Sequence, residues 1–358
     1  MTLAVRYTAA RTLDTAPALD VPPGPGEVEL APAYVGICGT DLHIFHGDMD
    51  ARVAAPAVLG HEMSGRIVRV GPDVEGWAPG DAVTVMPLRW DDTCPACRAG
   101  HRHICHHLDF IGIDSPGAMQ QRWTVPATTL VRLPEALPLD HAALVEPTAV
   151  AVHDVGRAQV AEGEKTVVVG GGPVGILIAL VAQAAGADVR VVELSAHRRA
   201  LARELGLTAW DPAANDIGVL VGEWTAGAGA EVAFEVSGAA GGVDTAVDVL
   251  GVRGRLCLVA IHPRPREINL HRFFWRELTL VGARLYDRAD FEKAVALVAD
   301  GTIPADRLIT KTVPLTEAPA AFEALESGGD VMKILVDCTD TTAPTHLTDD
   351  DAAQGAAI

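Results

Sequence analysis

Short hydrophobic runs, separated by glycine and proline, fill the chain up to about residue 150. Apolar and polar side chains alternate along GEVELAPAYVGICG, MSGRIVRVG and GDAVTVMPL. Because successive side chains of a strand point to opposite faces, this period of two predicts strands with one buried face. The intervening Gly and Pro residues predict turns and long loops. We therefore expect an all-β barrel or sandwich in this part of the chain.

From about residue 155 the pattern changes to apolar β runs that alternate with segments of helical period. The predicted strands are TVVVG, DVRVVEL, EVAFEVSG and GRLCLVA, and the predicted helices cover residues 174–185, 196–205 and 243–250. Nearly continuous apolar strands alternating with helices are typical of a parallel sheet covered on both faces. This region is thus predicted to be α/β, with a doubly wound parallel sheet.

The last part of the chain returns to the first domain in this interpretation. A helix is predicted over residues 290–300, and KILVDC is predicted to form a final strand. The predicted domains are residues 1–153 together with 287–358, and residues 154–286 between them. Residues 339–358 are polar and lack periodicity, so a flexible tail is predicted there.

Length and charge narrow the possible classes of function. A chain of 358 residues exceeds what one hydrophobic core usually organises, which agrees with two domains. The 47 acidic and 28 basic residues give a formal charge of -19, which argues against nucleic acid or an anionic membrane surface as a partner. The apolar stretch over 167–187 contains a glycine turn and fits a strand and a helix better than a membrane span. The N-terminus lacks the pattern of a secretion signal, so a cytoplasmic location is predicted.

A glycine-rich turn, VVVGGGPVG, follows the first strand of the α/β region and opens a helix. In a dinucleotide-binding turn the first glycine makes the bend, the second lets the backbone approach pyrophosphate, and the third lets helix and strand pack closely. These roles fall on Gly170, Gly172 and Gly175. Pyrophosphate would then bind at the helix N-terminus.

Glu193 ends the next predicted strand, where an acidic side chain accepts hydrogen bonds from the adenosine ribose and repels a 2′-phosphate. NAD is therefore favoured over NADP. Residues 195–199 include a serine, a histidine and two arginines that could receive that phosphate, so NADP stays open as the alternative. The candidate cofactor-binding residues are Gly170, Gly172, Pro173, Val174, Gly175, Glu193, Arg198, Ser237 and Ala260.

Cys38 and the adjacent His61 and Glu62 offer a thiolate, an imidazole and a carboxylate. These three ligands can hold zinc with one position open, which indicates catalysis because a closed set of four protein ligands supports structure only. Thr40 and His43 follow Cys38 closely and are candidates for passing a proton to solvent. Together with the dinucleotide turn, this set predicts alcohol oxidation by hydride transfer to a nicotinamide.

Two further groups complete the candidate metal chemistry. Glu146, in LVEPTAVAVH, adds a carboxylate that can reach the zinc directly or through its water. Cys94, Cys97 and Cys105 lie in one short polar segment, which in a reducing compartment indicates metal more than disulfides. The other cysteines, at 257 and 338, are predicted to be buried in the core.

The motifs occur in the order CGTDLH, GHEMSG, GDAV, the cysteine lobe, EPTAVAVH, GGGPVG and MKILVD across about residues 25–338. In this the chain resembles the zinc-dependent medium-chain dehydrogenases. Glu146 resembles the branch of polyol, butanediol and threonine dehydrogenases, because ethanol-type members carry cysteine there. The resemblance implies a GroES-like catalytic domain, a Rossmann domain, and a homotetramer or homodimer. It also implies catalytic zinc at Cys38, His61 and Glu62 with Glu146 in or near the first shell, and a proton relay through Thr40 and His43.

The family's structural zinc is held by four cysteines, and here the first ligand position falls on Asp91. An aspartate and three thiolates still form a closed tetrahedral set, so the resemblance implies a second zinc at Asp91, Cys94, Cys97 and Cys105. A lobe without metal is the alternative. Possible substitutes for Asp91 are Asp92, His101, His103, His106 and His107.

The expected substrate is a small alcohol or the corresponding ketone. Sorbitol-type members carry arginine directly before the tyrosine of this segment, whereas GARLYDRAD places Leu285 there and Arg284 one position earlier. The hypothesis is NAD-linked oxidation of a secondary alcohol in a small diol, polyol, cyclitol or β-hydroxy amine. A zinc-free enone or quinone reductase, and a non-catalytic nucleotide-binding protein, are the alternatives. Candidate pocket-wall residues are Phe45, Trp90, Phe110, Arg284 and Tyr286.

Overall fold

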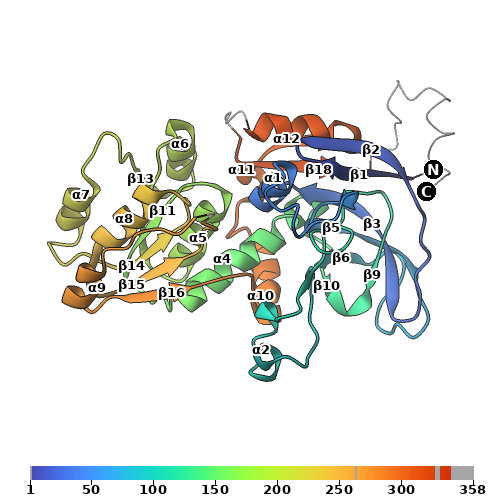
Figure 1. The fold of residues 1–358 in the computed structure, drawn as a ribbon, viewed down its shortest axis with the longest axis horizontal. Coiled ribbons are helices and arrows are strands. Elements are labelled where there is room, and N and C mark those ends of the chain that lie inside the picture. The colour runs from blue at the N-terminus through green and yellow to red at the C-terminus, as the bar shows by residue number, and fades with distance from the viewer. Residues whose placement is uncertain (1, 263, 327–330, 340–358) are drawn as a thin grey trace.

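The computed structural model describes residues 2–262, 264–326 and 331–339. The chain forms two halves that lie side by side along its longest axis, with α4 and α10 between them (Figure 1). The half to the right in Figure 1 is rich in β-strands and contains segments from both ends of the chain. The other half contains a parallel sheet. Residues 340–358, most of the predicted flexible tail, lie outside the described residues.

The β-rich half is built on a seven-stranded sheet of order β10-β6-β5-β3-β18-β17, in which β9 also pairs with β3. A three-stranded sheet, β2-β1-β4, and a two-stranded sheet, β7-β8, complete it. The strands are β1 (Thr2–Ala9), β2 (Thr12–Ala18), β3 (Glu27–Gly36), β4 (Ala57–Val58), β5 (Glu62–Val70), β6 (Ala82–Val85), β7 (Leu88–Arg89), β8 (Asp109–Phe110), β9 (Trp123–Pro126), β10 (Leu130–Arg132), β17 (Ile309–Pro314) and β18 (Lys333–Asp337). The β-rich fold predicted for this part of the chain is therefore confirmed, and the final strand β18 pairs with β3.

Short helices connect these strands and carry several of the candidate site residues. They are α1 (Gly39–Phe45), α2 (Pro95–Arg98), η1 (Arg102–Ile104), η2 (Ala127–Thr129), α3 (Leu139–Ala142), α10 (Arg288–Ala299), α11 (Ala305–Leu308), η3 (Leu315–Glu317) and α12 (Ala318–Glu326). Helix α10 begins two positions before the predicted start at Asp290, because Asp287 and Asp290 form a capping box that satisfies free N–H groups of its first turn.

The other half contains a six-stranded parallel sheet of order β13-β12-β11-β14-β15-β16. Its strands are β11 (Lys165–Val169), β12 (Asp188–Val192), β13 (Thr208–Trp210), β14 (Ala230–Glu235), β15 (Leu250–Leu258) and β16 (Thr279–Gly282), and its helices are α5 (Pro173–Ala184), α6 (Ala196–Glu204), α7 (Ile217–Trp224), α8 (Ala240–Asp248) and α9 (Leu270–Arg276). This order reverses between β11 and β14, which defines a doubly wound sheet with a ligand crevice at that point. The predicted α/β architecture is confirmed.

A second predicted boundary also differs from the structure. The helix expected near residues 243–250 is α8, which ends at Asp248, and Leu250 already begins β15. The apolar positions of the two elements run into one another, so helical and strand periods could not be separated there.

Helix α4 (Val145–Arg157) connects the halves and packs against α5 on one side and α10 on the other. Ten of its residues are buried, including the polar Glu146, His153 and Asp154. The predicted domain boundary at residue 153 falls inside this helix, and the domain limits stay a prediction. Within the described residues, no helix is long and apolar enough to cross a membrane.

Gly175 lies where α5 comes closest to the turn after β11. A Cβ atom on Gly175 would come within 1.9 Å of the Gly170 carbonyl oxygen, so helix and strand would have to separate. We expect Gly175→Ala to lower the melting temperature by several degrees in differential scanning fluorimetry, because close packing around a rigid turn resists added volume. Gly222→Ala in α7 is the matched control. A Cβ there meets nothing within 4 Å, and alanine favours helix, so stability should stay equal or rise. Equal melting temperatures for both variants would contradict this account of the turn.

Candidate functional site

The three predicted ligands of the catalytic zinc meet at one point. Cys38 follows β3 as the N-cap of α1, and His61 and Glu62 stand at the start of β5, which pairs with β3. One ligand atom of each residue lies within 4.8 Å of the others. His61 and Glu62 are buried, and Cys38 is half-buried. A thiolate, an imidazole and a carboxylate at this spacing fit a zinc ion and leave a fourth coordination position for another ligand.

Asp41 supports His61 and was not predicted as a site residue. It is fully buried on α1, and its Oδ2 accepts a hydrogen bond from the Cys38 N–H at 2.9 Å. Its Oδ1 lies 3.7 Å from His61 Nδ1, and neither atom has a hydrogen-bond partner within the described residues. A carboxylate behind a ligating histidine fixes the tautomer and directs Nε2 at the metal. The available signal was the aspartate one helical turn after Cys38 in CGTDLH.

Glu62 forms a buried ion pair with Lys333 of β18. The Lys333 Nζ lies 2.9 and 2.6 Å from the two carboxylate oxygens, and the side chains are 4% and 1% exposed. Removing a carboxylate from water is costly unless an opposite charge compensates it. Lys333 therefore compensates the buried Glu62 carboxylate and fixes its position beside Cys38. The sequence signal for this residue was a lysine at the start of an apolar strand.

Glu146 lies beside the zinc group rather than within it. It stands in the first turn of α4, and its Oε1 accepts a hydrogen bond from the Tyr286 hydroxyl at 2.6 Å. Burial raises the pKa of Glu146 to about 7, against the opposing effect of nearby His61. The Glu146 carboxyl group is thus held close to the candidate zinc ligands by Tyr286, which lies 140 positions later in the chain.

Thr40 and His43 stand on α1 after Cys38. Thr40 is half-buried, whereas the His43 side chain is 43% exposed and its Nδ1 lies 3.3 Å from Asp48 Oδ2. The two residues thus lead from the zinc group toward solvent along one short helix. The proton relay through them stays a prediction.

The glycine turn has space for a ligand where a dinucleotide requires it. Gly170 has a φ of +109°, and a Cβ there would come within 2.9 Å of the Ser237 backbone nitrogen. At Gly172 a Cβ would meet only an Arg198 guanidinium nitrogen, at 3.7 Å. Pro173 and Val174 then begin α5. The backbone around Gly172 therefore stays open to pyrophosphate, at the N-terminus of a long helix.

The other candidate cofactor residues surround this turn. Glu193 follows β12, and its carboxylate accepts hydrogen bonds from the Gly171 and Ser195 N–H groups at 2.7 and 2.6 Å. Ser237 and Ala260 follow β14 and β15, the next strands across the point where the strand order reverses. The carboxyl ends of neighbouring parallel strands therefore meet where a dinucleotide would bind.

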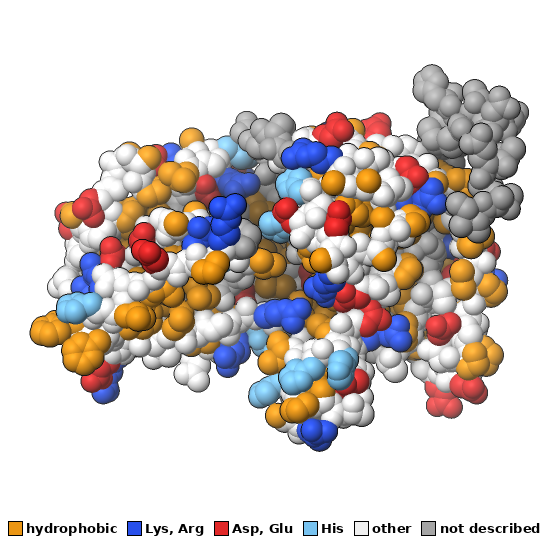
Figure 2. Space-filling model, viewed as in Figure 1, with side chains coloured by type: hydrophobic (Ala, Val, Ile, Leu, Met, Phe, Trp, Pro, Cys, Tyr) orange, Lys and Arg blue, Asp and Glu red, His pale blue; other side chains and the backbone are white. Residues whose placement is uncertain are grey.

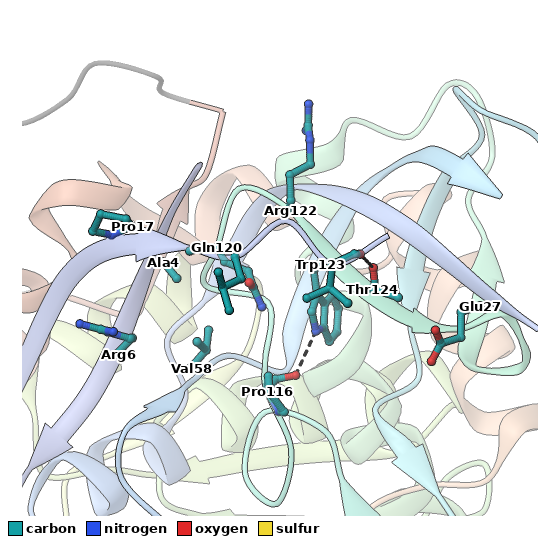
Figure 3. Close-up of a pocket in the computed structure, with 13 residues that line it drawn as sticks. Ala4, Arg6, Pro17, Glu27, Val58, Pro116, Gln120, Arg122, Trp123 and Thr124 are labelled. Carbon is teal, nitrogen blue, oxygen red and sulfur yellow. Dashed lines mark hydrogen bonds between the residues drawn. The ribbon is translucent and has the colours of Figure 1, made fainter. Parts of the chain in front are cut away.

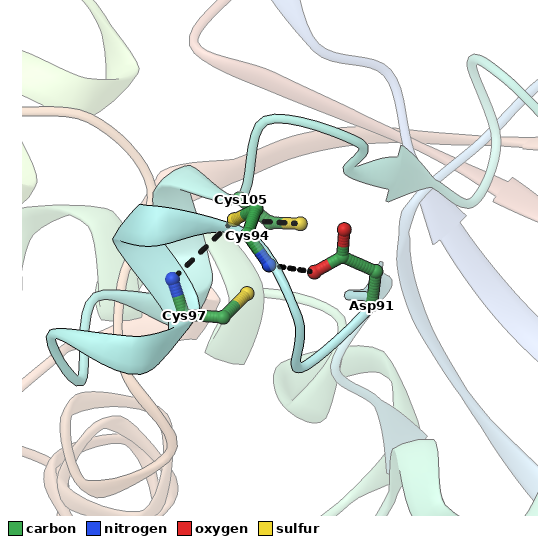
Figure 4. A group of neighbouring side chains, drawn as sticks. All are labelled: Asp91, Cys94, Cys97 and Cys105. Carbon is green, nitrogen blue, oxygen red and sulfur yellow. Dashed lines mark hydrogen bonds between the residues drawn. The ribbon is translucent and has the colours of Figure 1, made fainter.

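Asp91 and three cysteines form the second group of metal ligands, in the lobe around α2 (Figure 4). One ligand atom of each residue lies within 4.8 Å of the others. The Cys94 and Cys105 sulfur atoms are 3.8 Å apart. Of the alternatives considered, Asp91 is the residue that joins the cysteines, and its Oδ1 also accepts from the Cys94 N–H at 3.0 Å. Four such ligands fit a structural zinc.

Four of the five candidate pocket-wall residues separate into two sets. The Phe110 ring lies 5.1 Å from the His61 ring, and Tyr286 holds Glu146, so both border the zinc group. Phe45 is buried in the hydrophobic core, and Trp90 packs against the cysteine lobe. Phe45 and Trp90 therefore have packing roles.

A groove of about 470 Å³ on the β1-β2 side of the molecule has a different character (Figure 3). Its Arg6 is paired with Asp14 at 2.9 Å, and the Trp123 indole N–H donates to the Pro116 carbonyl at 2.9 Å. None of the candidate catalytic or cofactor residues lines this groove. Figure 2 shows a hollow between the two halves of the molecule.

A fold that combines a β-rich half carrying a Cys-His-Glu group with a doubly wound sheet carrying a dinucleotide turn defines a nicotinamide-dependent, zinc-dependent dehydrogenase. The chain matches the family model for the alcohol dehydrogenase GroES-like domain over residues 24–135 and the model for zinc-binding dehydrogenase over residues 173–300. The chain belongs to the zinc-dependent medium-chain dehydrogenase family.

Three known proteins illustrate this membership. A 2-dehydro-3-deoxy-L-galactonate 5-dehydrogenase of Pseudoalteromonas atlantica is 45% identical over 94% of this chain and 98% of its own length. An L-galactonate-5-dehydrogenase of Escherichia coli is 32% identical over 84% of this chain and 88% of its own. The crystal structure of 2R,3R-butanediol dehydrogenase from Bacillus subtilis has a TM-score of 0.88 and 31% identity, covering 94% of this chain and 99% of that one.

These comparisons confirm the fold and the main functional hypothesis. The protein is an NAD(P)-dependent oxidoreductase of the zinc-binding family, acting on the alcohol of a small molecule. The zinc-free reductase and the non-catalytic nucleotide-binding protein are not supported.

Metal content tests the two ligand groups separately. After dialysis against a weak chelator we expect two zinc ions per chain by mass spectrometry, because both donor sets combine anionic ligands with burial. Cys38→Ser should leave one zinc and abolish turnover, and Cys97→Ser should leave one zinc and lower the melting temperature. Cys338→Ala, a buried cysteine outside both groups, is the control and should retain two. A single zinc in the wild type that disappears with Cys38→Ser would reject the second site.

Proposed function

We propose that this enzyme oxidises a secondary hydroxyl group of a sugar acid, with NAD as the hydride acceptor. The printed names of two relatives describe dehydrogenases of galactonate-type sugar acids. Such a substrate differs from a neutral polyol by one carboxylate, so its enzyme needs an unneutralised cation near the zinc group. Arg284 is the observation that carries the proposal.

Arg284 lies between β16 and Tyr286, at the junction of the two halves. Its side chain is exposed and makes no ion pair or hydrogen bond with any residue that the structure describes. Protein atoms around its guanidinium, and then the nearby Arg52, lower the pKa of Arg284, whereas Asp114 raises it. The Arg284 guanidinium therefore lies near a second positive charge, that of Arg52.

Asp114 neutralises only one of the two guanidinium groups. It accepts two hydrogen bonds from Arg52, at 2.7 and 2.6 Å, and one from the Phe110 N–H at 2.8 Å. Phe110 in turn packs on His61, which places this charge cluster next to the zinc group. The Arg284 guanidinium is therefore left without a neutralising carboxylate, although the net charge of the chain is -19. A substrate carboxylate would complete the pairing, since arginine binds carboxylates through two parallel hydrogen bonds.

The roles of the remaining residues follow from their positions. Zinc, when bound, supplies a Lewis acid that acidifies an alcohol, and NAD accepts the hydride. Cys38, His61 and Glu62 would hold the zinc, with Glu146 reaching it directly or through a water. Thr40 Oγ1 would accept the substrate hydroxyl proton and pass it to the exposed ring of His43. The cytoplasmic location and the homotetramer or homodimer stay predictions from sequence.

Substrate preference tests the proposal. We expect kcat/KM for L-galactonate and related 2-keto-3-deoxy sugar acids to exceed that for the neutral galactitol by about tenfold or more, the effect of one hydrogen-bonded charge pair. Arg284→Gln should remove this preference by raising KM for sugar acids while leaving neutral polyols unaffected. Arg253→Gln, which removes an arginine paired with Glu277 in the other half, is the control and should change nothing.

The same panel identifies the other outcomes. Metal-replete protein should be assayed with vicinal diols, inositols, amino-cyclitols and threonine alongside the sugar acids. A neutral substrate that is preferred over every sugar acid would reject the carboxylate site but retain the dehydrogenase. Equal losses for charged and neutral substrates in Arg284→Gln would show that Arg284 supports the fold instead.

Coenzyme choice depends on Glu193. Its carboxylate is fixed by two backbone N–H groups and still has lone pairs for the ribose hydroxyls, while Arg199 is bound to Asp211 at 2.6 Å. We expect wild-type kcat/KM to favour NAD over NADP, and Glu193→Ala to shift the ratio toward NADP by about tenfold or more through loss of charge repulsion. Glu204→Ala, on the far end of α6, is the control. A wild-type preference for NADP would contradict this role of Glu193.

A further inference from the structure

A third group of metal-ligand side chains lies outside both zinc sites. His103, His153 and Asp287 each offer one ligand atom, and the three atoms lie within 4.8 Å of one another. The residues come from three different segments: η1 in the cysteine lobe, α4, and the N-cap of α10. His103 was a candidate substitute for Asp91 in the cysteine group, but the structure places it in this separate cluster.

Two aspartates orient the imidazole rings. His103 Nδ1 lies 2.9 Å from Asp287 Oδ1, and His153 Nδ1 lies 2.8 Å from Asp290 Oδ2. The same two aspartates form the capping box of α10, so their positions are fixed by the helix start. The ring centroids are 4.8 Å apart at an angle of 62°. The two rings have no other hydrogen bond within the described residues, so His153 Nε2 is available to an ion, and at His103 an ion would replace the Nδ1 contact with Asp287.

The burial of the cluster suits a metal better than a water-exposed ion pair. The His103 and His153 side chains are 8% and 7% exposed, whereas Asp287 is 48% exposed. Two imidazoles buried face to edge need an interaction that compensates their lost hydration. The exposed Asp287 carboxylate provides a route from solvent to both rings.

We propose that His103, His153 and Asp287 bind a third divalent transition-metal ion, for which zinc is the natural probe. Two imidazoles and a carboxylate, with remaining positions for water, are a common donor set for such ions. Ligands about 2.0–2.1 Å from a tetrahedral zinc lie roughly 3.3 Å apart, so the cluster needs only small side-chain rotations to close on the ion. Asp290 stays behind His153 as the carboxylate that holds the ligating ring.

The ion would connect three parts of the molecule that the chain itself does not join directly. The cysteine lobe projects from the β-rich half below α10 in Figure 1, and α4 carries Glu146 in its first turn. His153 lies two helical turns after Glu146, on the same side of α4. The bound ion would therefore connect the cysteine lobe to α4, the helix that positions Glu146. It would be a structural site, separate from the two zinc sites that bind more tightly.

Metal titration of the intact enzyme tests this site. Protein that retains its chelator-resistant zinc should be titrated with Co²⁺ and followed by its visible absorption. We expect one further saturable ion whose spectrum lacks the intense near-ultraviolet charge-transfer band of cobalt–thiolate bonds. Asp287→Asn, which keeps the N-cap, and His103→Asn should weaken this binding by about 10- to 100-fold. His101→Asn, an exposed histidine of the same lobe, is the matched control and should bind as the wild type does.

Added Zn²⁺ provides a second readout that does not depend on turnover. Added Zn²⁺ should raise the melting temperature of the wild type and of His101→Asn, but not that of Asp287→Asn. Without added metal, the three proteins should have the same melting temperature. Absence of a further saturable ion in the wild type would overturn the proposal. Equal binding by Asp287→Asn and His101→Asn would overturn it as well, as would a thiolate band, which would place the cobalt in a cysteine group.

Discussion

The buried ion pair between Glu62 and Lys333 is the interaction on which the zinc group depends. The two residues are 271 positions apart in the chain, and their charges are almost completely removed from water. Each charge alone would be too costly to bury, so the carboxylate can stand beside Cys38 only when β18 is paired with β3. The ligands close to the N-terminus are thus kept in their working state by a strand close to the C-terminus.

Much of the fold could be predicted because its determinants are local. The alternating runs before residue 150 and the apolar runs after residue 155 each carry the period of their own secondary structure. The glycine turn could also be predicted from the sequence. Glycine is needed there because Gly170 has a positive φ and Gly175 has no room for a side chain. The candidate zinc ligands Cys38, His61 and Glu62 could be proposed from the sequence because zinc accepts few side-chain types, and the structure brings them together.

The residues that were missed act through contacts between distant segments. Asp41 and Lys333 were visible as charges within apolar surroundings, but their partners depend on how β3, β5 and β18 align. Tyr286 was interpreted as a pocket wall, whereas its hydroxyl reaches Glu146 across 140 positions. The cluster at His103 likewise needs α4 and α10 to be in contact. Such pairings follow from tertiary packing and leave no periodic signal in the chain.

The place of β18 in the sheet has a consequence for biosynthesis. During synthesis on the ribosome, β3 is made early and can pair with β5 and β9. The C-terminal half of β3 also pairs with β18, and this partner strand is absent until residues 333–337 have been made. The whole parallel sheet is synthesised in that interval and can fold as a unit. The nascent chain therefore carries an open strand edge for most of its translation, and unpaired edges of this kind are where chains associate wrongly. Completion of the last strand closes that edge and, in the same event, delivers the lysine that neutralises Glu62.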